Sequence, residues 1–187
     1  MFNENTPEQG RLLLSEPFIL DPTFERSVVM LCEHTTAGSL GLILNHKSQL
    51  LLSDIIADLS GIDLPVYLGG PVENHALFFL HRAYDKLKSG TLIHNDIYWG
   101  GDFDLLKILL QEGLIGAQEI KFFIGYSGWD PHQLHQEIEQ NSWAVHQKYD
   151  SDLIFLLDGE DLWKQALISL GPKYAHVANF PKSPFLN

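Results

Sequence analysis

The sequence contains only one cysteine, Cys32, among its 187 residues. A single cysteine excludes a disulfide bond within the chain, and it is typical of proteins that stay in a reducing compartment. Residues 1–10 lack the basic and apolar regions of a secretory signal peptide, and no apolar run reaches the ~18 residues of a membrane span. We therefore expect a cytoplasmic protein without a membrane anchor.

Basic residues are also scarce. Lys and Arg number 12 against 24 Asp and Glu, which gives a formal charge of −12. Proteins that bind nucleic acid rely on cations to neutralise phosphates, and the closest basic residues here are Lys86 and Lys88 beside Arg82. We therefore expect no direct binding to nucleic acid. The acidic balance suits a soluble protein, and it would also suit a basic partner.

A complete motif for catalysis or for a cofactor is also missing. Gly69-Gly70-Pro71 lacks the lysine of a P-loop and the third glycine of a dinucleotide-binding fold. We interpret it as a turn that ends a strand where one backbone passes close to another, and it could also line a cleft. The sequence predicts no cofactor and no bound metal.

The composition that is present is typical of a globular protein. Hydrophobic residues make up 45% of the chain and charged residues 19%. The length fits one domain, because domains typically hold ~100–200 residues. We expect residues 1–9 to form a flexible leader and residues 10–187 to form a single domain.

Hydrophobic runs and turn residues predict both strands and helices. Strands are predicted over residues 12–14, 27–32, 40–44, 66–68, 76–81, 120–124, 143–149 and 153–157, with a further strand within 91–99. Helices are predicted to begin at the N-cap residues Ser53, Asp102, Asp130 and Asp158. Because strands come in runs with helices scattered between them, we predict an α/β domain of the α+β type. Its sheet is mixed and largely antiparallel, with helices packed on it.

Gly125-Tyr126-Ser127-Gly128 lies between a predicted strand and a predicted helix. This layout is similar to the nucleophile elbow of hydrolases, but Trp129 stands where that motif has its second glycine. We favour the interpretation that the glycines allow a tight turn with positive φ over a catalytic role for Ser127.

The helix after Asp130 carries His132 and His135 near one face, where the two imidazoles could share a metal. Glu137 falls off that face and no second pair of ligands is present, so we favour surface-exposed helix residues. Asp130 is interpreted as the helix cap and not as part of a phosphate site, because its carboxylate would occupy the free amides.

Cys32 and His34 are two residues apart at the end of a predicted strand, so they are expected to share one side of the sheet. A thiol beside an imidazole can be an activated nucleophile. A cysteine that ends an apolar run is more often inert packing, and we favour that interpretation.

Several blocks carry a resemblance to a known family. The first holds Asp21-Pro22, Phe24, Arg26-Ser27-Val28-Val29 and Glu33-His34, and the second holds Gly38 and Gly41-Leu42-Ile43-Leu44-Asn45. Gly69-Gly70-Pro71-Val72, Asp96 and Gly125-Tyr126-Ser127-Gly128-Trp129 with Gln133-Leu134 and Glu137 follow. In order and spacing these blocks resemble the YqgE/AlgH family from about Gly10 to the end of the chain. His46-Lys47 and His135 depart from the usual pattern, in which a basic residue precedes proline and a glutamate is common.

The resemblance implies a compact bacterial α/β domain, and some members carry the label of transcriptional regulators. That label implies an effect on gene expression and does not imply a DNA-binding surface, because the sequence lacks a helix-turn-helix signature. The family supplies no catalytic residues to carry over.

The resemblance does suggest a site, because its signature positions fall mostly at strand ends and turns. Polar residues at such positions can converge on one edge of a sheet. The competing interpretation is a buried ion pair between Arg26 and Glu33, with glycines that only make turns. We predict a shared cleft or partner-binding surface lined by Arg26, Glu33, His34, Asn45, Gly69, Gly70, Tyr126, Trp129 and Gln133.

Two functions follow as hypotheses. The first is a non-enzymatic binding or regulatory protein that acts through contacts with a protein partner. The alternative is a small-molecule enzyme, such as a hydrolase, with a cleft around Glu33, His34 and Gly125–Trp129 in which His34 acts with Ser127 or Cys32. The sequence leaves the ligand, the partner and the oligomeric state open.

Overall fold

The computed structural model describes residues 6–182. The strands are β1 (Leu12–Ser15), β2 (Val28–Thr35), β3 (Gly38–Ile43), β4 (Lys47–Leu51), β5 (Pro65–Leu68), β6 (Val72–His81), β7 (Thr91–His94), β8 (Ile97–Trp99), β9 (Ile120–Trp129) and β10 (Trp143–His146). The helices are α1 (Leu52–Ile55), α2 (Tyr84–Leu87), α3 (Phe103–Gln111), α4 (Gln133–Glu139), α5 (Ser151–Leu156), α6 (Gly159–Leu170) and α7 (Pro172–Ala175). Three short 3-10 helices are η1 (Pro22–Phe24), η2 (Ala57–Leu59) and η3 (Val177–Asn179).

The strands form one ten-stranded sheet in the order β10-β1-β2-β3-β9-β6-β8-β7. The β4–β5 pair joins this sheet through a parallel contact of β5 with β9, and every other pair is antiparallel. The predicted α/β class with a mixed, largely antiparallel sheet is therefore confirmed.

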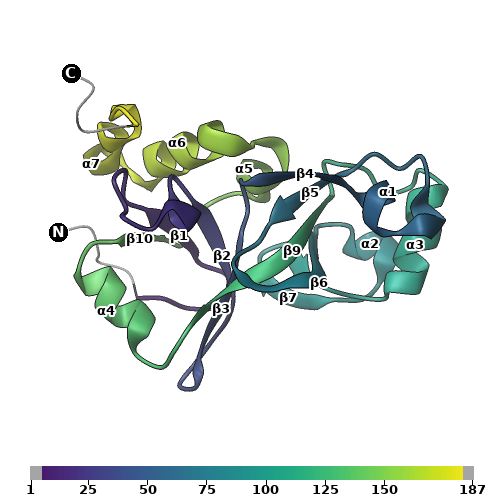
Figure 1. The fold of residues 1–187 in the computed structure, drawn as a ribbon, viewed down its shortest axis with the longest axis horizontal. Coiled ribbons are helices and arrows are strands. Elements are labelled where there is room, and N and C mark those ends of the chain that lie inside the picture. The colour runs from purple at the N-terminus through teal and green to yellow at the C-terminus, as the bar shows by residue number, and fades with distance from the viewer. Residues whose placement is uncertain (1–5, 183–187) are drawn as a thin grey trace.

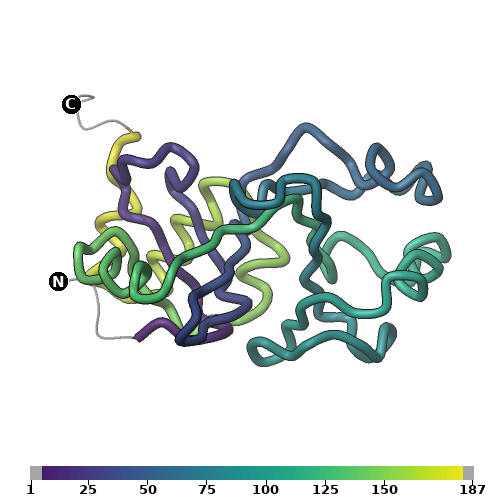
Figure 2. Tube along the Cα trace, turned by 60° about the horizontal axis from the view of Figure 1, so that its bottom comes forward, coloured from purple at the N-terminus to yellow at the C-terminus, as the bar shows by residue number. Residues whose placement is uncertain are grey.

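Strand β9 connects two halves of the molecule (Figure 1). One half contains β10, β1, β2 and β3, and the other contains β4, β5, β6, β7 and β8. The first residues of β9 pair with β5 and β6, where Phe122 lies opposite Val66 and Phe79. Its last residues pair with β3, where Trp129 lies opposite Ser39. In Figure 2 this segment is the green tube that runs between the halves. One continuous strand thus belongs to both parts of the sheet.

Helices cover both faces of the sheet made by β10, β1, β2 and β3 (Figure 1). α4 contributes Leu134 and Ile138 to a core on one face, and α6 contributes Leu162 and Trp163 to the core on the other face. Because both faces are covered, residues 28–32 of β2 are all buried, as their continuous apolar run predicts. The core of the other half lies against α1 and α3, with Leu106 and Phe122 at its centre.

Three predicted elements are wrong. Residues 153–156 belong to helix α5 and not to a strand, because Asp150 caps a helix there by accepting the N–H of Asp152, and Leu157 follows the helix. The tight turn predicted at residues 125–128 is absent from the described backbone, since β9 continues to Trp129. The helix predicted to start at Asp130 begins at Gln133, after His132 at φ 70°. Strand β4 was not predicted.

The caps predicted for two other helices are confirmed. Asp102 accepts the N–H of Leu105 at the start of α3, and Asp158 accepts the N–H of Gly159 at the start of α6. Ser53 does not cap a helix, since α1 begins at Leu52 and ends after one turn.

The described part of the predicted leader, residues 6–9, lies against β2. Pro7 is buried, and the side-chain amide of Gln9 donates a 2.9 Å hydrogen bond to the carbonyl of Cys32. Residues 1–5 of the predicted leader and residues 183–187 of the predicted domain lie outside the described residues. Within residues 6–182, no helix has the length and apolar character needed to cross a membrane.

Candidate functional site

The end of the β2–β3 hairpin is the point around which the candidate site is built. A bulge between Leu31 and Glu33 interrupts the pairing of β2 with β3. Because of this bulge, Cys32 packs into the core beneath α6, whereas His34 lies on the opposite face beside α4. The prediction that Cys32 and His34 share one side of the sheet is therefore wrong, since a bulge breaks the alternation of side chains.

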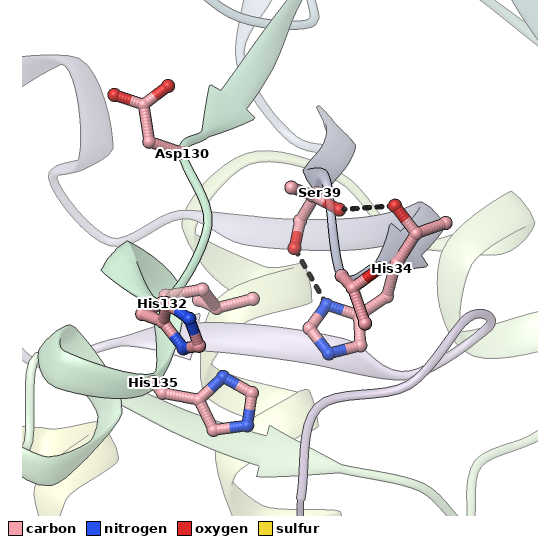
Figure 3. A pocket seen from close by; sticks show the side chains of 9 residues that line it. His34, Ser39, Asp130, His132 and His135 are labelled. Atoms are coloured by element: carbon pink, nitrogen blue, oxygen red, sulfur yellow. Dashed lines mark hydrogen bonds between the residues drawn. The ribbon is translucent and has the colours of Figure 1, made fainter.

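The first cavity, which we call the histidine pocket, lies between this hairpin and the start of α4. It has a volume of about 530 Å³. Figure 3 shows His34 on the hairpin and His135 on α4, with their rings next to each other in the pocket. The ring centroids are 5.6 Å apart and the ring planes are tilted by 35°. Its lining residues are His34, Thr35, Thr36, Gly38, Ser39, Asp130, His132, Leu134 and His135.

His34 is held in the histidine pocket by one hydrogen bond. Its Nδ1 lies 2.7 Å from the hydroxyl oxygen of Ser39 on the neighbouring strand (Figure 3). Partial burial lowers the pKa of His34, and the nearby His135 lowers it further, against an opposing effect of Glu8. The lowered pKa favours the neutral imidazole, whose Nδ1 accepts from or donates to the Ser39 hydroxyl according to the tautomer.

The second cavity, which we call the Tyr126 groove, shares Thr35, Gly38, Ser39 and Asp130 with the histidine pocket. It has a volume of about 450 Å³. Val72 and Gly128 are exposed in it, while Leu40 and Tyr126 are half-buried. Its lining residues are Glu33, Thr35, Ala37, Gly38, Ser39, Leu40, Val72, Tyr126, Gly128, Trp129 and Asp130.

Trp129 is fixed between the groove and α4. Its indole N–H donates a 2.8 Å hydrogen bond to Glu137, and Trp143 of β10 donates another to the same carboxylate oxygen. Gln133 donates to the second oxygen of Glu137 and accepts the N–H of Asp130. Gln133 therefore holds the start of α4 and lines neither cavity.

Gly69 and Gly70 allow two backbones to cross. A Cβ atom on Gly70 would lie 2.2 Å from the carbonyl group of Tyr126, and one on Gly69 would lie 2.3 Å from the carbonyl oxygen of Gly125. Gly125 has φ +69°, so the positive φ predicted there is present although the tight turn is not. The close approach of backbones predicted for Gly69-Gly70-Pro71 is confirmed.

Arg26 and Asn45 lie at a different place, near the start of α6. Arg26 forms an ion pair with Glu160 and donates to the carbonyl of Phe180, so the alternative pair of Arg26 with Glu33 is not formed. Asn45 donates to the carbonyls of Arg26 and Gly159 and accepts the N–H of Val28. The structure does not bring the predicted residues into one cleft. Glu33, Tyr126 and Trp129 line the Tyr126 groove and His34 lines the histidine pocket, whereas Arg26, Asn45, Gly69, Gly70 and Gln133 line neither cavity.

Two candidate nucleophiles have structural roles. Ser127 is buried and donates its hydroxyl proton to the carbonyl of Gly69. Cys32 is fully buried, and burial raises the pKa of its thiol well above the ordinary value. Among the described residues, no group of three or more His, Cys, Asp or Glu is placed to hold a metal, although His135 and His132 both line the histidine pocket.

The sequence reasoning missed Ser39 and Val72. Ser39 reaches His34 because the two residues are paired in the β2–β3 hairpin, and the register of a hairpin fixes which side chains meet. Val72 reaches the groove because it pairs with Tyr126 across β6 and β9. The pairing of Val72 with Tyr126 has no local sequence signal, since β6 and β9 are far apart in the chain. The pairing of His34 with Ser39 is local, but it depends on the register of the hairpin.

Comparison with known proteins places this geometry in a family. The family model described as AlgH-like matches residues 12–175. The chain belongs to the AlgH-like family. A "UPF0301 protein" of Cytophaga hutchinsonii is 41% identical over 181 residues, covering 96% of this chain and 98% of the relative. Another, from Bacteroides fragilis, is 43% identical over 187 residues, covering 99% of this chain and 94% of the relative.

Two solved structures have the same fold as this chain. The solution structure of the AlgH protein from Pseudomonas aeruginosa matches with a TM-score of 0.71 at 25% identity, covering 96% of this chain and 98% of that one. A crystal structure of a Corynebacterium diphtheriae protein matches with a TM-score of 0.75 at 23% identity, covering 95% of both chains. The names of the UPF0301 and AlgH relatives state no reaction.

Proposed function

We propose that this protein is a non-enzymatic binding protein with a regulatory role, and that it acts by contacting another protein at the Tyr126 groove. The observation that carries the proposal is the groove itself, about 450 Å³ in volume with aliphatic and aromatic side chains in its lining. Aromatic residues are enriched in protein interfaces, and the anchor side chains of a partner fill pockets on the surface that they bind. The buried states of Ser127 and Cys32 favour binding over catalysis by either residue.

A groove can be tested by filling it. Gly128 is exposed in the groove and has an ordinary extended backbone, and a Cβ atom there would lie 3.4 Å from the ring of Tyr126 and 3.9 Å from Val72. Gly128→Leu therefore occupies the groove without straining the strand. Gly116→Leu is the matched control, because Gly116 is exposed and a Cβ there meets nothing within 4 Å.

The experiment is an affinity capture from an extract of the source cells with the tagged full chain. We expect a protein that is retained by the wild type and by Gly116→Leu but is lost with Gly128→Leu. Thermal unfolding of each variant checks that the fold is intact. Capture of the same proteins by Gly128→Leu would overturn the groove as the contact surface, and the absence of any specifically retained protein would overturn the binding role.

A second candidate is favoured by one specific contact. The 2.7 Å distance between Ser39 Oγ and His34 Nδ1 is that of a nucleophile and its general base. In this alternative the protein is a hydrolase of small esters. Ser39 attacks the substrate carbonyl while His34 takes the hydroxyl proton, the alcohol leaves with that proton, and water then releases the acid from Ser39. Against it, no carboxylate within residues 6–182 is hydrogen-bonded to His34, so its ring lacks the orienting group of a triad.

The hydrolase alternative makes its own measurable claim. If it is correct, the protein cleaves p-nitrophenyl acetate faster than free imidazole does, and Ser39→Ala abolishes the excess. A fluorophosphonate probe would label Ser39 and no other residue. Equal rates for the wild type and Ser39→Ala would exclude this mechanism and leave the binding proposal in place.

A further inference from the structure

The Tyr126 groove carries two carboxylates that the fold does not use. Glu33 lies at the end of β2 and Asp130 directly follows β9, and both are exposed. Within the described part of the chain, neither side chain forms a hydrogen bond or an ion pair. By contrast, Glu160 binds Arg26, Lys164 and Lys182. The two groove carboxylates are thus available to an external cation.

Basic side chains are missing from the same surface. No Lys or Arg is among the described residues that line the Tyr126 groove or the adjoining histidine pocket. The chain as a whole carries a formal charge of −12. A concave surface with one sign of charge concentrates the field there and attracts ligands of opposite sign. The groove therefore favours a cationic ligand and disfavours phosphate groups.

The walls of the groove suit a particular kind of cation. The ring of Tyr126 is held by an edge-to-face contact with Phe78, with centroids 5.9 Å apart and an interplanar angle of 85°. An aromatic face can hold a guanidinium or an ammonium group, and aliphatic neighbours can cover the methylene stem of such a side chain. Leu40 and Val72 are the aliphatic neighbours, and Gly128 leaves room beside them.

We propose that the Tyr126 groove binds a segment of the partner protein through a lysine or arginine side chain. The methylene stem lies against Val72 and Tyr126, and the charged end is neutralised by Glu33 and Asp130. This inference rests on the proposed function, because it names the chemistry of the partner at the same groove. It assigns no role to His34 or Ser39.

The test uses peptides selected from a random phage-displayed library against the immobilised full chain. The selected peptides are synthesised with blocked ends, and their affinities are measured by fluorescence anisotropy. We expect them to contain lysine or arginine, and we expect replacement of that residue by citrulline or norleucine to weaken binding about tenfold or more. Two exposed ion pairs at up to ~1 kcal/mol each would supply a factor of that order.

Charge variants of the protein complete the test. The double variant Glu33→Gln with Asp130→Asn is expected to weaken the same peptides about tenfold. Glu112→Gln with Glu139→Gln is the matched control, because it removes two exposed carboxylates that line neither cavity. Equal losses in both double variants would show a nonspecific effect of net charge and overturn the proposal.

The outcomes separate this inference from the proposed function. If Gly128→Leu abolishes peptide binding but the peptides lack basic residues, the groove is a contact surface and the cationic ligand is wrong. If basic peptides bind Gly128→Leu as tightly as they bind the wild type, the groove is not their binding site. That result overturns both the groove as a contact surface and its binding of a basic side chain. Only basic peptides that lose affinity with Gly128→Leu and with Glu33→Gln plus Asp130→Asn support the inference.

Discussion

The indole Nε1 of Trp129 donates a 2.8 Å hydrogen bond to Oε2 of Glu137. That carboxylate also accepts the indole N–H of Trp143 and the side-chain amide of Gln133, so it joins β9, β10 and α4. Trp129 and Trp143 are both buried, and their indole planes meet at 80°. Glu137 therefore supports one wall of the Tyr126 groove from behind.

Removing this carboxylate is expected to destabilise the protein. Glu137→Ala removes the oxygen that accepts both buried indole N–H groups, and the loss of a hydrogen bond to a buried group costs about 1–3 kcal/mol. We expect the free energy of unfolding in urea to fall by about 2–4 kcal/mol. Glu137→Gln keeps one acceptor oxygen and should lose less. An alanine variant as stable as the wild type would show that water satisfies both indoles.

The crossing of backbones at Gly70 is expected to admit no side chain. Gly70→Ala places a Cβ atom 2.2 Å from the backbone of Tyr126, so one strand must shift. Gly171→Ala is the control, because Gly171 also has a positive φ but a Cβ there meets nothing within 4 Å. We expect Gly70→Ala to lower the free energy of unfolding by about 1–3 kcal/mol more than the control does. Equal losses of stability in the two variants would mean that the positive φ alone causes the loss and that the steric clash at Gly70 contributes nothing.

Lys121 predicts an unusual dependence of stability on pH. It is buried, its Nζ donates to the carbonyls of Leu44 and Leu157, and burial lowers its pKa to about 8, against the attraction of Asp158. The unfolded chain holds the proton up to about pH 10.5, whereas the folded chain releases it near pH 8. The unfolded state thus binds more protons between these two pH values. The contribution of Lys121 to the free energy of unfolding therefore rises by about 3 kcal/mol from pH 8 to pH 10.5.

The measurement compares the free energy of unfolding of the wild type and Lys121→Met at several pH values from 7 to 10.5. The difference between the two isolates Lys121 from other titrating groups. We expect it to move in favour of the wild type as the pH rises. Lys148→Met, which removes an exposed lysine, is the control for the loss of one positive charge. A flat difference for Lys121→Met would show that its pKa is not lowered by folding.

Cys32 is expected to be inert in the folded protein. The thiol is fully buried, and burial raises its pKa. A thiol reagent can therefore react with Cys32 only in molecules that have unfolded or opened locally. We expect the labelling rate with iodoacetamide to follow the unfolding equilibrium as urea is added. Ser60→Cys adds an exposed thiol and should be labelled at once. Fast labelling of Cys32 in the native protein would instead point to a local opening of β2.

The sequence predicted the local features of the fold better than its long-range pairings. Asp102 and Asp158 were correctly predicted as caps, because a cap acts on amides within a few residues. The strand predicted over residues 153–157 was wrong, because a short apolar run fits a buried helix as well as a strand. The cap of Asp150 was the overlooked local signal for that helix.

The candidate site was predicted only in part for the same reason. Glu33, Tyr126 and Trp129 meet because β2, β3 and β9 are neighbours, which follows from the sheet order and not from the motif. Arg26 was expected in the same cleft, yet its partner Glu160 lies 134 positions away in sequence. No pattern near Arg26 indicates which of the acidic residues it will meet. Whether the groove is used as proposed stays a prediction.

Strand β9 has a consequence for how the protein comes apart. Residues 120–124 of β9 pair with β5 and β6, and residues 127–129 pair with β3, so the strand is part of both halves. If one half unfolds and its residues of β9 leave the sheet, the other half loses backbone hydrogen bonds to the same strand. Heating should therefore give one calorimetric transition, and a chain severed within β9 should yield two fragments that regain structure only when mixed.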